Sequence, residues 1–81
     1  MAVSIQFLGV QRHMTNTDSI DMPITKETKV SDAIEYLRQK YPNLHLDDGM
    51  IIAVVNLETA SRDRILRDND TVSFLPVIGG G

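Results

Sequence analysis

The chain has 81 residues, of which 42% are hydrophobic, and a formal net charge of -3. This length fits one domain with one compact core, so a deep active-site cleft is not expected. The acidic balance argues against a nucleic-acid partner, and the absence of cysteine excludes disulfides, thiol nucleophiles and zinc-thiolate sites.

No apolar run is long enough for a transmembrane helix, and Met1 to Ser4 lacks the basic and apolar regions of a signal peptide. We therefore expect a cytoplasmic protein without a membrane partner. No internal repeat interrupts the sequence. We expect one domain over residues 1–81, with a flexible glycine tail at 78–81.

Two strands are predicted near the N-terminus by apolar residues that alternate with polar ones. The first strand directs three side chains to the core, namely Val3, Ile5 and Phe7. The second ends at Ile24 and contains Pro23, which has no N–H to donate and therefore favours a sheet edge. Residues 10–18 between them are predicted to form a loop, so that the two strands make a hairpin.

A helix follows, because its apolar residues recur at intervals of three and four. The residues on this face are Val30, Ala33, Ile34, Leu37 and Tyr41. Thr28 or Ser31 could cap its start, and Pro42 ends it.

The continuous apolar run Ile51–Val55 is typical of a strand that is buried on both faces or lies centrally. The last strand, residues 71–76, directs Val72 and Phe74 to the core and Leu75 to the opposite face. We expect the helix to pack on these two core residues, on the first strand and on Val54. This element order predicts an α+β fold of the β-grasp type, in which a mixed four- to five-stranded sheet wraps around one helix.

The C-terminal sequence is Leu75-Pro76-Val77-Ile78-Gly79-Gly80-Gly81. Three residues without a Cβ lead directly to a free carboxylate, with a strand immediately before them. Such an end has two interpretations. It is either a frayed terminus, which tolerates small residues, or a slim terminus that is presented to a partner.

The segment from Val72 to Gly81 is similar to the final strand, proline and glycine tail of the molybdopterin synthase small subunit. Over essentially its whole length, the chain resembles the ThiS/MoaD-type ubiquitin-like sulfur carriers. It departs from their pattern at Val77, where a second proline is common, and at Asn69, where glycine is usual. The turn Leu57-Glu58 also replaces a small polar or glycine turn.

The resemblance implies that the Gly81 carboxylate is the reactive group, with Gly79 and Gly80 as its slim lead-in. A ubiquitin-activating-like enzyme would use ATP and magnesium to adenylate this carboxylate. A sulfur donor protein would then convert it to a thiocarboxylate. An acceptor enzyme, such as a molybdopterin synthase large subunit, would receive the sulfur. The carrier itself would be a cosubstrate rather than an enzyme and would bind no cofactor.

Partner binding is expected beside the tail, where exposed apolar side chains would serve as anchors. The predicted partner-binding residues are Leu8, Leu75, Pro76 and Val77. His13 and His45 are interpreted as solvated loop residues, so no metal site is expected. Three alternatives stay open: a thiamine-pathway sulfur carrier, a protein modifier that is conjugated to lysines, and an interaction module with incidental glycines.

Overall fold

The computed structural model describes residues 1–44, 46 and 48–76, with Asp48 described by its backbone alone. The elements in chain order are β1 (Ala2–Gln6), α1 (Val10–Thr15), β2 (Ser19–Pro23), α2 (Val30–Lys40), the 3-10 turn η1 (Asp48–Met50), β3 (Ile51–Val55), β4 (Glu58–Ala60) and β5 (Thr71–Pro76).

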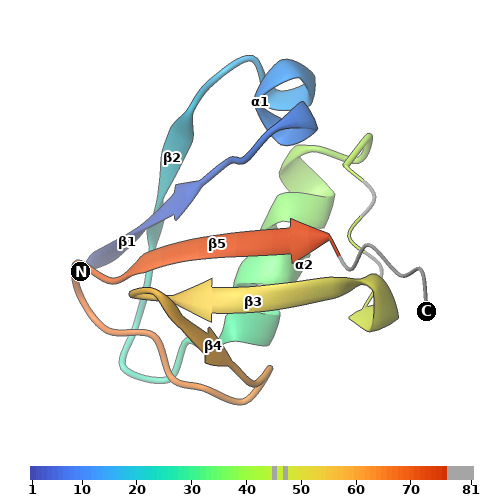
Figure 1. Ribbon diagram of the computed structural model, residues 1–81. Coiled ribbons are helices and arrows are strands. Elements are labelled where there is room, and N and C mark those ends of the chain that lie inside the picture. Colours follow the sequence, from blue (N-terminus) through green and yellow to red (C-terminus); the bar gives the residue numbers. More distant parts are fainter. Residues whose placement is uncertain (45, 47, 77–81) are drawn as a thin grey trace.

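The strands form one five-stranded sheet in the order β2-β1-β5-β3-β4, and α2 crosses one of its faces (Figure 1). The first and last strands, β1 and β5, pair in parallel, whereas the other neighbours are antiparallel. This is the predicted mixed β-grasp sheet. The prediction that Pro23 lies in an edge strand is also confirmed, because β2 has a neighbour on one side only.

The core lies between α2 and the covered face of the sheet. Its most deeply buried side chains are Val3, Ile5, Val30, Ala33, Leu37, Ala53, Val55, Leu66, Val72 and Phe74. Phe7 closes one end, where its ring meets Tyr41 edge to face with 5.6 Å between centroids. The predicted apolar face of α2 is therefore confirmed.

The prediction of a loop over residues 10–18 is wrong, because Val10–Thr15 forms the short helix α1. Gly9 turns the chain into this helix with φ 54°, and Asn16 ends it in the left-handed region with φ 59°. The Thr15 hydroxyl donates a hydrogen bond to the Gln11 carbonyl at 2.9 Å. A helix of six residues is too short to show a helical period in the sequence.

Strand β3 is central in that it has a neighbour on each side, but it is not buried on both faces. Its side chains alternate: Ala53 and Val55 face the core, Val54 is half-buried and Ile52 is 40% exposed. Val54 is therefore wrongly predicted as a core residue. Continuous apolarity here reflects exposed side chains on the second face, which no element covers in the described part of the chain.

The start of α2 also differs from the prediction. Lys29 is the N-cap residue, and its N–H donates to the Asp32 carboxylate at 2.8 Å. The Thr28 hydroxyl instead accepts a hydrogen bond from the Thr25 N–H in the preceding turn. An acidic residue in the first turn also suits the positive end of the helix dipole.

The side chain of Gln11 continues the parallel ladder between β1 and β5. In that ladder the Ser4 N–H donates to the Asp70 carbonyl, and pairing ends at Gln6 opposite Ser73. By the same offset, the Leu8 N–H would next donate to the Phe74 carbonyl. Instead, the Leu8 N–H donates to Gln11 Oε1 at 3.0 Å, and Gln11 Nε2 donates to the Phe74 carbonyl at 2.8 Å. The inserted amide therefore fixes α1 against the end of β5.

The opposite end of β5 is held by Asn56, in the turn between β3 and β4. Its backbone N–H donates to the Thr71 carbonyl, and its side chain binds the Thr71 N–H and the Asp70 carboxylate. Burial disfavours the ionised form of Asp70. Hydrogen bonds from Arg67 and Asn56, with the positive charges of Arg64 and Arg67, outweigh this and lower the pKa of Asp70. The carboxylate thus stays ionised at neutral pH and clamps the turn to β5.

We expect Leu57→Gly to stabilise the protein. Leu57 is 97% exposed and has φ 71°, so it strains the turn without packing against anything. Glycine adopts this conformation without a Cβ clash and should raise the free energy of unfolding by about 0.5–1 kcal/mol. Thermal unfolding followed by circular dichroism should show a melting temperature roughly 2–8 °C higher. Leu57→Ala, which keeps the Cβ, is the control; an equal gain there would contradict this explanation.

We expect Gln11→Ala to accelerate hydrogen exchange of the Leu8 amide, because the variant removes the acceptor of that N–H. Loss of the two hydrogen bonds should also cost about 1–3 kcal/mol of stability. Gln11→Glu is the informative comparison, because it keeps an acceptor for Leu8 and loses the donor to Phe74. Leu8 should stay protected in that variant. Equal protection of the Leu8 N–H in Gln11→Ala and in the parent protein would show that the Gln11 side chain is not the group that protects it.

Candidate functional site

The candidate site is the end of β5, from which the C-terminal segment leaves the domain. The last residue of β5, Pro76, lies opposite Ile51 at the start of β3. Val77 and the predicted reactive end, Gly79 to Gly81, lie outside the described residues. The structure therefore describes the residues that surround the end of β5.

One surface beside the exit is the open face of the sheet. Leu75 lies opposite Ile52 in the β3–β5 register, and these two side chains are 38% and 40% exposed. They form an apolar pair on the face that α2 does not cover. Ile52 was not predicted as a site residue, because continuous apolarity over Ile51–Val55 indicated a strand that is buried on both faces or lies centrally and did not single out an exposed side chain.

The second surface is a hollow, here called the exit groove, with a volume of about 410 Å³. One wall comes from the end of β1 and from α1, and the other from the segment after α2. Its apolar lining is Leu8, Val10, Met14, Leu44, Leu46 and Pro76. Two predicted partner residues, Leu8 and Pro76, are thus brought together, while Leu75 lies beside Ile52 on the open face.

Val10 and Met14 were not predicted as site residues. They are 71% and 40% exposed, and both lie on α1. Their spacing of four is the available signal, because it places two side chains on the same side of a helix. One pair of residues is too little to reveal a helix when the segment is expected to be a loop.

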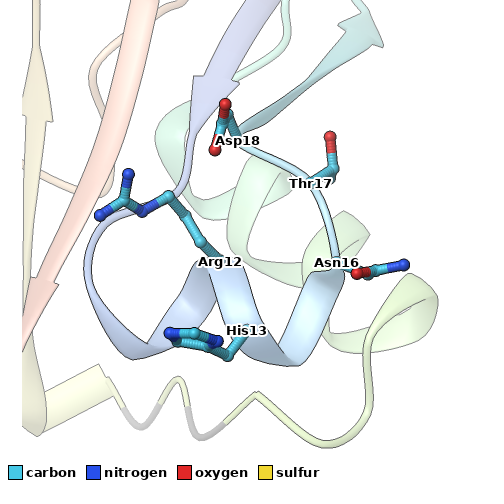
Figure 2. A pocket seen from close by; sticks show the side chains of 5 residues that line it. All are labelled: Arg12, His13, Asn16, Thr17 and Asp18. Carbon is cyan, nitrogen blue, oxygen red and sulfur yellow. The ribbon is translucent and has the colours of Figure 1, made fainter.

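A polar hollow of about 580 Å³ lies on the other side of α1 (Figure 2). It is lined by Arg12, His13, Asn16, Thr17 and Asp18. Figure 2 shows that the side chains of Arg12, Asn16 and Asp18 point in different directions rather than toward a common point. No acid, base or anion clamp is assembled there, so this hollow is not a candidate active site.

His13 is exposed on α1 rather than in a loop, and His45 lies outside the described residues. Within the described ranges, no group of three histidine or acidic side chains could hold a metal ion. No helix there is long and apolar enough to cross a membrane.

The fold is similar to those of solved ubiquitin-like proteins. The crystal structure of SAMP1 from Haloferax volcanii superposes with a TM-score of 0.81 at 17% identity, and the match covers 100% of both chains. A chain in the protein–protein complex of subunits 1 and 2 of molybdopterin-converting factor from Helicobacter pylori matches with a TM-score of 0.66 at 20% identity, again over 100% of both chains. At these identities, the likeness establishes the ubiquitin-like β-grasp fold.

Two curated relatives extend the similarity to the sequence, and both are molybdopterin synthase sulfur carrier subunits. The protein from Mycobacterium tuberculosis is 29% identical over 80 residues, which cover 98% of this chain and 96% of the relative. The protein from Escherichia coli is 31% identical over 85 residues, which cover 98% of this chain and 99% of the relative. The model of the ThiS family matches residues 5–81. The chain therefore belongs to the ThiS family.

Proposed function

We propose that this protein is a sulfur carrier in the biosynthesis of molybdopterin or a related cofactor. The observation that carries the proposal is the way β5 leads to the terminus. β5 lies between β1 and β3, and only five residues, three of them glycines at the end, follow Pro76. The names of the two curated relatives support the same function.

The proposed chemistry takes place at the Gly81 carboxylate. A carboxylate is a poor electrophile, because its negative charge repels nucleophiles. Its oxygen attacks the α-phosphate of ATP, which releases pyrophosphate and leaves an acyl adenylate. A donor that supplies sulfur at the oxidation level of sulfide then attacks the carbonyl carbon. The C–O bond to AMP breaks, and the products are a thiocarboxylate and AMP.

In this scheme the carrier acts as a cosubstrate. A ubiquitin-activating-like enzyme supplies ATP, magnesium and the catalytic groups, and a sulfur donor protein supplies the sulfur. Glycines at positions 79–81 suit passage through a narrow channel, because no side chain limits the approach to the backbone. The Helicobacter pylori complex holds two subunits, which supports an acceptor enzyme that binds the carrier.

Two related functions use the same terminus. One is sulfur transfer in the thiamine pathway. The other is conjugation of Gly81 to lysines, which is suggested by the fold shared with the small archaeal modifier protein 1 of Methanosarcina acetivorans, with a TM-score of 0.79 at 22% identity. The reaction product separates conjugation from sulfur transfer, because it is an amide in one case and a thiocarboxylate in the other.

The chemical prediction concerns the intact mass of the protein. With ATP, magnesium, the activating enzyme of the same organism and a sulfide source, we expect a gain of about 16 Da, as sulfur replaces one oxygen at Gly81. Deleting Gly81 withdraws the carboxylate by about 3.5 Å. Since a misplacement of about 1 Å can cost 100-fold in rate, the deletion should abolish the gain.

A second variant carries one alanine after Gly81, so that the free carboxylate no longer belongs to Gly81. This variant should also fail to react. An adduct with a lysine of another protein would instead support the modifier function. An unchanged mass in the presence of an enzyme that activates a known carrier would reject both functions.

The partner prediction concerns Leu75, which lies next to the exit on the open face. We expect Leu75→Asp to weaken binding to the activating enzyme about 10-fold or more, because apolar anchors dominate interface energies. Titration calorimetry would measure this, and circular dichroism would verify the fold. Leu57→Asp is the control, since Leu57 is an exposed leucine in the turn between β3 and β4, which lies at the opposite end of β5. Equal binding by the Leu75→Asp and Leu57→Asp proteins would remove Leu75 from the interface.

A further inference from the structure

The exit groove combines an apolar lining with direct contact to the point where the chain leaves. One wall carries Leu8, Val10 and Met14, whose side chains are 39%, 71% and 40% exposed. The other wall is made by Leu44 and Leu46, which are 6% and 4% exposed. A hollow of this kind exposes apolar surface to water, so an apolar side chain that fills it would be stabilised.

The inserted amide of Gln11 gives the groove a fixed shape. Gln11 is itself part of the lining, and its side chain bonds both the Leu8 N–H and the Phe74 carbonyl. Because these bonds tie α1 to β1 and β5 at once, Val10 and Met14 are held at a set distance from Pro76. The groove is therefore already formed in the absence of any partner.

The chain's own C-terminal segment is the occupant that this position favours. Pro76 lies in the wall, and the next residues are Val77 and Ile78. Side chains alternate along an extended chain, so Ile78 would share the side of Phe74 and Pro76, whereas Val77 would share the side of Leu75. In an extended chain Ile78 would lie about 7 Å beyond Pro76, which is itself part of the groove lining.

We propose that the exit groove binds the Ile78 side chain of the chain's own C-terminal segment. This anchor narrows the expected flexible tail from residues 78–81 to residues 79–81. Ordering two residues opposes the gain from burying one side chain, so the anchor is reversible and a partner can draw the tail away. The role of this anchor in presenting Gly81 rests on the proposed function. The contact between Ile78 and the groove does not depend on that function.

The test uses the isolated full-length protein, with ¹³C-labelled methyl groups and NMR spectroscopy. We expect nuclear Overhauser contacts between Ile78 and the methyl groups of Val10 and Met14. Ile78→Ser should remove these contacts and shift the Val10 and Met14 signals. Deletion of residues 77–81 should shift them in the same way. Val77→Ser is the matched control, because its side chain would lie on the other side of the segment, and it should leave those signals in place.

A reciprocal variant alters the groove instead of the tail. Val10→Ser changes a side chain that is 71% exposed, so the core should be unaffected. We expect the backbone order parameter of Ile78 to fall from a value near 0.8 to below about 0.6. Leu57→Ser, at the far end of β5, should leave it unchanged.

Absence of contacts between Ile78 and the groove in the isolated protein would overturn the proposal. Contacts that weaken on dilution would also overturn it, because they would show the tail of a second molecule in the groove. Shifts of Val10 and Met14 that occur only when an activating enzyme is added would assign the groove to that partner instead. None of these measurements needs ATP or sulfur, so their failure leaves the mass test of sulfur transfer unaffected.

Discussion

The parallel pairing of β1 with β5 is the constraint on which the rest of the structure depends. It joins the first strand of the chain to the last. Bringing together segments so far apart in the sequence costs loop-closure entropy, and burial of both strands offsets that cost. Val3 and Ile5 from one strand and Val72 and Phe74 from the other supply that burial against α2. Because β3 pairs with the other side of β5, the final strand has no free edge. The chain therefore leaves a rigid strand at a defined point.

The end of this pairing is as important as the pairing itself. A direct bond between Leu8 and Phe74 would have continued the ladder and left no room for α1. Gln11 satisfies both backbone groups with one amide, so the two strands separate without leaving a donor or an acceptor unpaired. The end of β1, α1 and Pro76 then border the exit groove together with Leu44 and Leu46 from the segment after α2. The Gln11 amide, which takes the place of one backbone hydrogen bond, thus helps to form an apolar surface beside the terminus.

In a domain of this size, one helix covers one face of the sheet, and among the described residues no element covers the other, bare face. Leu75 and Ile52 lie on that bare face, and the exit groove lies on the other side of β5. Apolar surface therefore lies on both sides of the end of β5, where the C-terminal segment begins. The described residues assemble no acid–base pair or metal cluster beside it. The apolar surface on two sides of the exit is consistent with the proposed function, in which partner proteins bind beside the terminus.

The sequence by itself determined the features that arise from neighbouring residues. Alternation predicted β1 and β5, three-and-four spacing predicted the buried face of α2, and Pro23 predicted an edge strand. The reactive terminus at Gly81 stays a prediction, which rests on the resemblance to the sulfur carriers. Only the tertiary structure decided the role of residues 10–18, the exposed side of Ile51–Val55 and the composition of the exit groove. The bond from Gln11 to Phe74 joins residues 63 positions apart. Such a contact leaves no periodic signal in the sequence, because it exists only once β1 and β5 have paired.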